Sequence, residues 1–183
     1  VEGYHEDIIS FIKEIREKPP VLSKVTDIKI IDKEIEGYTD FKIIESVEEE
    51  EAITLLSPDI ATCDDCLADI SDVNNRRYRY AFTNCTNCGP RFSITKKVPY
   101  DRENTTMDVF QMCSECREEY NDPLNRRFHA QPNGCSKCGP RVYICNKEGN
   151  EIISNDPIKD IAKEIKNGKI VAIKGIGGFH FAC

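Results

Sequence analysis

The sequence lacks the features of a membrane or secreted protein. Nowhere do its 183 residues approach the roughly 18 consecutive apolar residues that a membrane-spanning helix needs. The N-terminal stretch VEGYHEDIIS has neither the basic segment nor the apolar run of a secretory signal. With 39% apolar and 31% charged residues, the composition is that of a globular chain. We therefore expect a cytoplasmic protein with no membrane partner.

An excess of positive charge is also missing. The net charge of -7 argues against a nucleic-acid partner, because phosphate binding is driven mainly by Lys and Arg. The acidity is uneven. Residues 1–62 carry 7 basic and 16 acidic side chains, whereas residues 63–145 carry 12 and 11. The centre of the chain is therefore close to neutral, and it is there that the cysteines gather.

Eight of the ten cysteines form four Cys-x-x-Cys pairs, with 18 residues between the first two pairs and 18 between the last two. A reducing compartment keeps thiols free, so this pattern favours metal over disulfides or a thioredoxin-like redox site. Two such pairs complete a closed, four-sulfur zinc site of the structural kind. The spacing predicts two zinc ions, one on Cys63, Cys66, Cys85 and Cys88 and one on Cys113, Cys116, Cys135 and Cys138.

The two halves of this region are copies of one another. Residues 63–91 match residues 113–141 at 11 of 29 positions without a gap, which indicates an internal duplication. Equal loops predict that each zinc lies within one half, although interleaved ligands would satisfy the same count. If each site supplies its own folding energy, a Cys85→Ser substitution is expected to unfold the first finger and leave the second folded.

The two knuckles of each half differ. The first runs into helix-compatible sequence, CLADIS or CREEYN, and a helix N-terminus stabilises a cysteine thiolate. The second, CxxCGPR, places Gly89 or Gly139 just after the last ligand. We expect a positive φ at both glycines, which would turn backbone amides toward the sulfurs.

Several other residues lie outside the two ligand sets. The paired arginines Arg76, Arg77, Arg126 and Arg127 are expected to order the loops of the module, and an anion-binding surface is the alternative. His129 is not needed as a ligand, because each site already has four sulfurs. Cys145 and Cys183 lie outside the pattern and are expected to be small buried residues.

The segments on either side of the cysteine-rich centre are predicted to form helices and strands. Apolar spacing predicts a helix from His5 to Glu17, followed by strands at Val25–Ile35 and in the FKII run at 41–44, and then an exposed acidic connection. Near the other end, Asp156 and Pro157 are expected to open a helix that Gly168 caps. A buried strand at 169–174 and a glycine-rich turn in GIGGFH follow.

Three stretches together carry a family resemblance: SPDIATCDDC, the doubled NRRY and NRRF with CxxCGPR, and KGIGGFHFAC. They resemble the carbamoyltransferases of NiFe-hydrogenase maturation, the HypF family. The resemblance implies an α+β chain with a truncated ferredoxin-like (acylphosphatase) segment, a loop-rich double four-cysteine zinc-finger module and the start of an α/β YrdC-like domain. The corresponding ranges are 1–46 for the acylphosphatase-like part, 47–60 for a linker, 61–146 for tandem fingers (61–96 and 111–146), and 147–183 for the YrdC-like start.

The resemblance also implies a reaction. Such an enzyme hydrolyses carbamoyl phosphate, uses ATP to form a bound carbamoyl adenylate, and passes the carbamoyl group to the C-terminal cysteine of a hydrogenase maturation partner, which converts it toward a cyanide ligand. The residues that match the opening of the family's nucleotide-binding domain are Lys174, Gly175, Gly177, Gly178 and His180.

The catalytic residues that this family would need are missing. Acylphosphatase-type sites hold phosphate with an arginine in a loop and place water with an asparagine. Residues 1–62 contain one arginine, Arg16, inside the predicted helix, and no asparagine precedes Asn74. The histidine-rich metal motif of the family's C-terminal domain has no counterpart either. We therefore expect no catalytic residues in this chain and no activity from it alone.

Two functions of different classes remain. One is part of a carbamoyltransferase that retains its structural zinc module, and the other is a free-standing zinc adaptor for a protein or nucleic acid. Because the chain begins on VEG, as if at the end of a strand, and stops after one glycine-rich turn, the first is expected.

Overall fold

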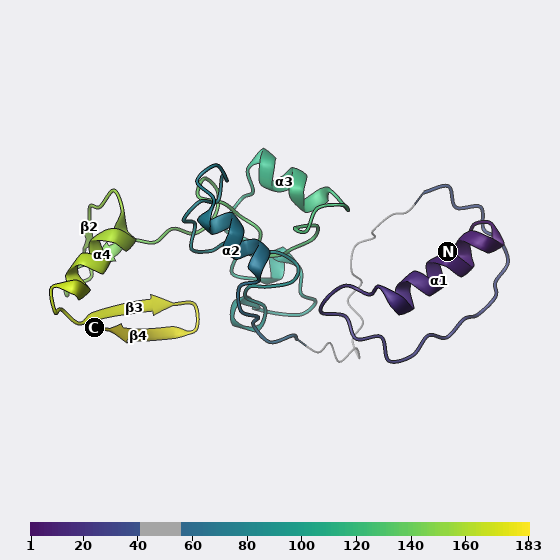
Figure 1. Cartoon of the computed structure of the whole chain (residues 1–183), viewed down its shortest axis with the longest axis horizontal. Helices are drawn as coiled ribbons and strands as arrows, with labels where there is room; N and C mark the ends of the chain where they lie inside the picture. The colour runs from purple at the N-terminus through teal and green to yellow at the C-terminus, as the bar shows by residue number, and fades with distance from the viewer. Residues whose placement is uncertain (41–55) are drawn as a thin grey trace. The chain divides into compact units, whose positions relative to one another are not determined.

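The computed structural model describes residues 1–40 and 56–183. Its contacts divide the chain into two units, Val1–Glu50 and Glu51–Cys183, which are described separately (Figure 1). The strand expected at 41–44 and the start of the acidic connection lie outside the described residues. Within the described residues, no helix combines the length and apolar character that crossing a bilayer requires.

The first unit contains helix α1, His5–Glu17, at the bounds the sequence predicts. The helix ends before Pro19 and Pro20, neither of which can donate a backbone hydrogen bond. The predicted strand at Val25–Ile35 is wrong, because this segment has no ladder pairing to any described residue. Ile30 and Ile31 are exposed there, and no strand among the described residues pairs with this β-branched segment.

The second unit begins with a repeated pattern, which we call the first finger (61–96) and the second finger (111–146). Helix α2, Asp64–Ser71, follows Cys63, and helix α3, Ser114–Asn121, follows Cys113. Two short 3₁₀ helices, η1 at Phe92–Ile94 and η2 at Arg102–Asn104, lie between them. The helices expected after both first knuckles are therefore confirmed.

The duplication extends to unusual backbone geometry. Arg79 and His129, fifty positions apart, both have a positive φ, 58° and 50°. In each finger the amide of this residue donates back to the last turn of the helix, to the carbonyl of Ile70 at 2.8 Å or of Tyr120 at 3.0 Å. A shared left-handed residue is costly for a side chain with a Cβ, so its repetition supports a common origin for the two fingers.

The C-terminal elements follow the second finger. Strands β1, Ile144–Cys145, and β2, Glu151–Ile152, pair antiparallel, then helix α4 spans Pro157–Lys166. Asp156 caps α4 as predicted by accepting a hydrogen bond from the amide of Lys159. Strands β3, Val171–Gly175, and β4, Gly178–Ala182, form an antiparallel hairpin.

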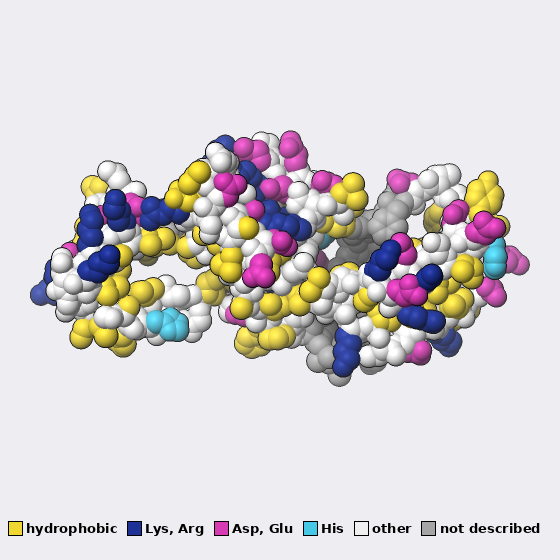
Figure 2. All heavy atoms as spheres, in the orientation of Figure 1, with side chains coloured by type: hydrophobic (Ala, Val, Ile, Leu, Met, Phe, Trp, Pro, Cys, Tyr) yellow, Lys and Arg dark blue, Asp and Glu magenta, His cyan; other side chains and the backbone are white. Residues whose placement is uncertain are grey.

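The strand expected at 169–174 is confirmed in position as β3, but its predicted burial is wrong. Four of the five residues of β3 are exposed, and Phe179 and Phe181 of β4 are 66% and 79% exposed. Figure 2 shows apolar side chains at the surface around this hairpin. Helix α4 contacts β3 but leaves most of the strand exposed, and an apolar run can be buried only where a layer covers it.

The core of the second unit is unusual in composition. Its fully buried side chains are sulfur-containing or polar, namely Arg77, Asn133, Thr105, Cys66, Cys85, Cys88, Cys116 and Cys135. Such a core buries little apolar surface, whereas burial of apolar surface is the main source of folding free energy in larger domains. The fingers therefore need another source of stability.

Candidate metal centres

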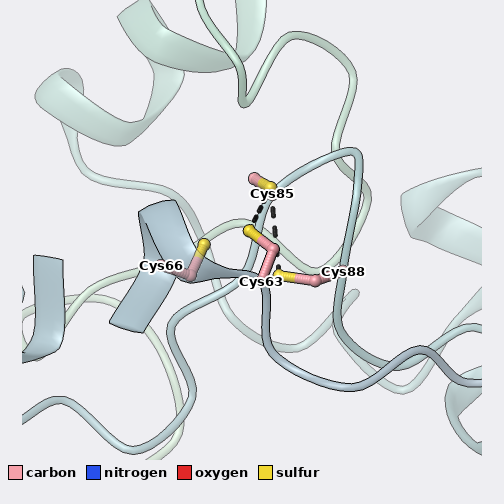
Figure 3. Close-up of side chains that lie close together, drawn as sticks. All are labelled: Cys63, Cys66, Cys85 and Cys88. Atoms are coloured by element: carbon pink, nitrogen blue, oxygen red, sulfur yellow. Dashed lines mark hydrogen bonds between the residues drawn. The ribbon is translucent and has the colours of Figure 1, made fainter. Parts of the chain in front are cut away.

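The first cluster brings together Cys63, Cys66, Cys85 and Cys88 (Figure 3). Cys63 is the N-cap of α2 and Cys66 lies in its first turn, while Cys85 and Cys88 come from the second knuckle. The Cys85 sulfur lies 3.7 Å from that of Cys63 and 3.8 Å from that of Cys88. Cys66, Cys85 and Cys88 have no exposed surface.

The second cluster repeats this arrangement with Cys113, Cys116, Cys135 and Cys138. The Cys135 sulfur lies 3.8 Å from the sulfurs of Cys113 and Cys138, and the Cys138 sulfur lies 3.6 Å from that of Cys116. Each cluster draws all its sulfurs from one finger, so the interleaved arrangement that the sequence left open does not occur.

The geometry of both clusters fits a tetrahedral metal ion. A tetrahedron with metal–sulfur bonds of about 2.3 Å has edges of about 3.8 Å, because the edge is 1.63 times the bond length. Five of the sulfur–sulfur distances, at 3.6 to 3.8 Å, match that edge, and all four sulfurs of each cluster lie within 4.8 Å of one another. A disulfide would require about 2.05 Å, and all ten cysteines are free.

One sulfur of each cluster is favoured as a thiolate. A hydrogen bond from Cys66 lowers the pKa of the Cys85 thiol to about 4. Burial alone would raise the pKa of Cys138, but hydrogen bonds from the backbone at Cys113 and Cys135 lower it to about 7. Since metals bind the thiolate form, the lowered pKa of these two thiols favours binding of a cation.

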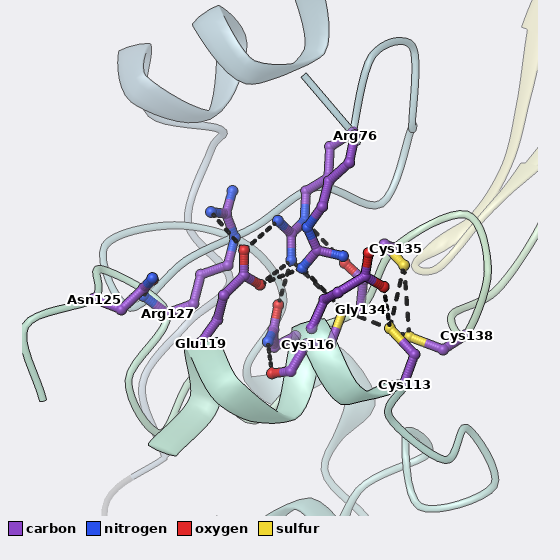
Figure 4. Close-up of polar contacts among 12 residues, drawn as sticks. Arg76, Cys113, Cys116, Glu119, Asn125, Arg127, Gly134, Cys135 and Cys138 are labelled. Carbon is purple, nitrogen blue, oxygen red and sulfur yellow. Dashed lines mark hydrogen bonds and ion pairs between the residues drawn. The ribbon is translucent and has the colours of Figure 1, made fainter. Parts of the chain in front are cut away.

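The arginines of the first finger reach the second cluster. Arg76 donates from Nη2 to the Cys116 sulfur at 3.3 Å, and both Arg76 and Arg77 bond the Glu119 carboxylate at 2.5 Å (Figure 4). Arg77, 2% exposed, also donates to the Gly134 carbonyl and to the Asn133 side chain, each at 3.0 Å.

The arginines of the second finger do the same in the opposite direction. Arg126 donates from Nη1 to the Cys66 sulfur at 2.9 Å. Arg126 and Arg127 both bond the carboxylate of Asp69 on α2, and Arg127 also donates to the Asn84 carbonyl at 3.1 Å. We call the four arginines with Asp69 and Glu119 the arginine bridge.

The arginine bridge supports the ordering role expected for these arginines over the anion-binding alternative. The two inner arginines, Arg77 and Arg127, are 2% and 5% exposed and their donors are used within the protein. Burial alone would raise the pKa of Glu119, but Arg77 and Arg76 lower it to about 2, so this carboxylate is ionised at neutral pH. Its charge offsets part of the arginine charge.

The arginines also suit a filled cluster electrostatically. Four thiolates around a divalent ion carry a net charge of about -2, and a buried anion of this kind needs nearby cations. Each cluster receives such cations from the other finger: Arg76 and Arg77 donate to the Cys116 sulfur, and Arg126 donates to the Cys66 sulfur. The duplicated NRR motif is therefore explained by the duplicated metal site.

Sequence analysis did not identify Arg102, which links the connection between the fingers to the second finger. Its guanidinium donates to the carbonyls of Gln131, Asn133 and Phe110 at 2.6, 2.8 and 2.7 Å. The residue lies in the unrepeated part of the centre, where comparison of the two halves could not single it out.

The two knuckle glycines are not equivalent. Gly89 has the expected positive φ, 100°, but the prediction for Gly139 is wrong. A Cβ on Gly139 would lie 2.1 Å from the Tyr80 hydroxyl, so a close approach, not a left-handed backbone, requires glycine there. The amide of Gly89 bonds the Ile60 carbonyl at 2.9 Å, and it is the amide of Asn87 that donates to a sulfur, Cys85, at 3.3 Å.

Several single residues can now be placed. His129 lies outside both clusters, with its ring 4.8 Å from that of Tyr120 and 4.6 Å from that of Phe128. The predicted burial of Cys145 and Cys183 is wrong, since both are exposed. Cys145 lies on a two-stranded sheet and Cys183 follows the β3–β4 hairpin, neither of which a described layer covers.

The residues expected to begin a nucleotide site lie on the β3–β4 hairpin. Gly175 pairs with Gly178 at the turn, with Gly177 between them, while Lys174 pairs with Phe179. His180 faces Ile173 across the hairpin and is exposed. Apart from the half-buried Gly178, these hairpin residues are exposed.

Comparison with known proteins identifies the same two segments. Residues 62–95 and 112–145 each match the HypF finger family. The whole chain is 53% identical to the probable carbamoyltransferase HypF of Methanocaldococcus jannaschii, and 97% of it is 45% identical to the carbamoyltransferase HypF of Rhodobacter capsulatus. The chain spans 24% of the length of each of these relatives.

Solved structures give the same result. A crystal structure of full-length HypF in the phosphate- and nucleotide-bound form superimposes with a TM-score of 0.84 at 50% identity, covering 98% of this chain and 23% of that one. The HypF of T. kodakarensis also gives 0.84, at 48% identity, covering 100% of this chain and 23% of that one.

Proposed function

This chain belongs to the HypF family, and we propose that it supplies the structural double zinc finger of a carbamoyltransferase. The observation that carries the proposal is the pair of four-sulfur clusters, with five sulfur–sulfur distances that match the edge of a zinc tetrahedron, each inside a segment that matches the HypF finger. The proposed ligands are Cys63, Cys66, Cys85 and Cys88 for one ion, and Cys113, Cys116, Cys135 and Cys138 for the other.

The role of these ions is structural. Four sulfurs fill the coordination sphere and leave no position for a substrate or an activated water. The helices α2 and α3 have 8 residues each, well below the roughly 12 residues at which an isolated helix becomes marginally stable. Zinc binding therefore supplies folding free energy that the small, polar core of the fingers cannot.

We propose for the whole protein the reaction implied by its family. It would use carbamoyl phosphate and ATP to carbamoylate the C-terminal cysteine of a hydrogenase maturation partner in the cytoplasm. In this proposal residues 1–46 belong to an acylphosphatase-like domain, residues 47–60 to a linker and residues 147–183 to a YrdC-like domain, in which Lys174, Gly175, Gly177, Gly178 and His180 contribute to a nucleotide site. Support comes from relatives named carbamoyltransferase and from a related structure described as phosphate- and nucleotide-bound.

A chimera tests this function. The segment of the Methanocaldococcus jannaschii HypF that aligns with this chain, at 53% identity, is replaced by residues 1–183. We expect the chimera to bind zinc at this segment and to keep carbamoyl-phosphate-dependent activity, whereas the same chimera with Cys85→Ser loses it together with one zinc. A folded, fully zinc-loaded chimera without activity would contradict the proposal, and the zinc adaptor alternative would then gain support.

A further inference from the structure

We infer that the two clusters form one coupled metal unit, in which loss of zinc from either finger weakens zinc binding in the other. The inference rests on the proposed zinc role and goes beyond it. It also replaces the expectation, drawn from loop spacing alone, that a Cys85→Ser chain keeps its second finger folded. The physical basis is the arginine bridge, because each finger completes the polar core of the other.

The first step is that each finger depends on its metal. The apolar cluster of the first finger consists of Cys66, Cys85 and Cys88, with Cys63 packed against it, so the ligands are also the core. Without the ion, α2 has 8 residues and little to pack against. Loss of zinc therefore removes the fixed positions of Cys66 and Asp69, which both lie on α2.

The second step is that these positions are needed by the other finger. Arg127 is 5% exposed, and its guanidinium bonds Asp69 and the Asn84 carbonyl, both in the first finger. Its next carboxylate, that of Glu119, is 4.0 Å away and already holds two other arginines. When the first finger unfolds, Arg127 loses its principal partners, and removing one partner of a buried charge pair is strongly destabilising.

The third step is that the dependence is reciprocal. Arg77, 2% exposed, belongs to the first finger, but its side-chain bonds go to Glu119, Gly134 and Asn133 of the second. Asn133 has no exposed surface and donates in turn to the Cys116 carbonyl at 2.9 Å, beside a ligand sulfur. Unfolding of the second finger therefore leaves the buried guanidinium of Arg77 without acceptors.

Backbone contacts add to the coupling. In the first finger, Thr86 lies between two ligands, and both its amide and its hydroxyl donate to the Arg126 carbonyl at 3.1 and 3.0 Å. The Asn84 side chain donates to the Pro132 carbonyl at 3.0 Å. The second knuckle of the first finger is therefore hydrogen-bonded to the segment that carries the second finger's arginines.

The test is zinc release from the 183-residue chain under excess chelator. In the wild type the two zinc ions are expected to leave together in one slow phase. In a Cys85→Ser, Cys88→Ser variant, the remaining zinc of the second finger is expected to leave at least about tenfold faster, because about 1.4 kcal/mol of lost coupling corresponds to that factor. Release of this zinc at the wild-type rate would overturn the inference.

A second variant leaves all eight ligands intact, in case the cysteine variant does not fold. Asp69→Asn lies in the first finger and contacts arginines that belong to the second. We expect both zinc ions to leave faster, by at least about tenfold, with an amplitude of two ions per chain. Acceleration of only one ion, or of neither, would mean that the fingers are independent.

The matched control is Glu118→Gln, a neutralised carboxylate on the exposed side of α3 next to Glu119. It is expected to release both ions at the wild-type rate. Elemental analysis before the chelator is added separates the two proposals. If the wild-type chain does not contain two zinc ions, the proposed function fails. If it contains two ions that leave independently, only the coupling is contradicted.

Discussion

Arg77 of the first finger lies 2.5 Å from the carboxylate of Glu119 on α3 of the second finger, although 42 residues separate them in the chain. The pair is buried on the arginine side, with 2% of that side chain exposed. The mirror pair joins Arg127 and Asp69. These pairs make the packing between the fingers a specific arrangement of charges and not a general hydrophobic contact.

The first prediction follows from the geometry of that pair. Arg77→Lys keeps the charge but loses the planar fork that reaches Glu119, Gly134 and Asn133 at once. We expect it to lower the free energy of unfolding by about 2–4 kcal/mol, measured by chemical denaturation at a fixed excess of zinc. The control is Arg117→Lys, an exposed position on α3, which is expected to change stability little.

The second prediction separates the two knuckle glycines. Gly139→Ala places a Cβ 2.1 Å from the hydroxyl of Tyr80 and 3.3 Å from its Cζ, and is expected to cost about 1–3 kcal/mol. Adding Tyr80→Phe removes the closest atom and should restore much of the loss. Tyr80→Phe alone is expected to be neutral or stabilising, because this buried hydroxyl has no hydrogen-bond partner among the described residues.

The Gly89→Ala variant provides the contrast. Gly89 has φ of 100°, where a Cβ is strained whatever the space, and the new atom would lie 2.7 Å from the Asn84 Cβ. No side-chain deletion relieves the backbone strain, so this variant should remain destabilised in the Tyr80→Phe background. Equal rescue of both alanine variants by Tyr80→Phe would contradict the distinction. The measurement is the midpoint of thermal unfolding with zinc in excess.

What the sequence could predict depended on how local each feature is. The Cys-x-x-Cys pairs define ligands a few residues apart, and the helices after Cys63 and Cys113 depend on sequence directly beside them. Both were therefore accessible. The partners of Arg77 and Arg127 lie 42 to 58 residues away on a repeated unit, and no periodicity states how two copies pack.

The predictions that were wrong concern features that depend on residues distant in the sequence. Val25–Ile35 has strand-like composition, but strand formation also requires a partner, and none of the described residues provides one. Gly139 matches Gly89 in sequence yet differs in backbone, and the need for glycine there comes from Tyr80, which approaches it from the other finger. In both cases tertiary contacts decided a feature that local pattern suggested.

The third prediction concerns the start of α4. Asp156 accepts from the Lys159 amide at 3.0 Å and pairs with Arg79 at 2.7 Å. Asp156→Ala should increase hydrogen exchange at the Lys159 amide, whereas Asp156→Asn, which keeps a cap acceptor, should remain near the wild type. Equal effects of both variants would show that the ion pair, and not the cap, holds the helix start.

The same carboxylate gives a pH dependence. The hydrogen bond from the Lys159 amide, and then Arg79, lower the pKa of Asp156 below its ordinary 3.8. A lowered folded-state pKa means that the cap contributes fully above pH 3.8 and is lost only as the pH falls through the lower value. Exchange at Lys159, corrected for the intrinsic rate, should therefore be constant between neutral pH and about pH 5.

The last prediction separates the chemistry of the family from what this chain can perform. The zinc-loaded chain, by itself, is expected neither to hydrolyse carbamoyl phosphate nor to catalyse carbamoyl-phosphate-dependent exchange of pyrophosphate into ATP. Phosphoryl transfer needs a fixed cation and a placed water. Residues 1–62 offer one arginine, which lies in α1, and no asparagine.

The expected lack of pyrophosphate exchange into ATP has a separate cause. A nucleotide pocket is an enclosed cleft with a few fixed polar groups, and the β3–β4 hairpin that carries Lys174 and His180 is mostly exposed. The four arginines of the bridge are engaged in contacts between the fingers. Weak binding of phosphate at the surface would not by itself indicate turnover. The measurement is phosphate release and isotope exchange, with the Cys85→Ser chain as the control for contaminating phosphatase. Release by the zinc-loaded chain well above that control would show that a phosphate site exists in this chain after all.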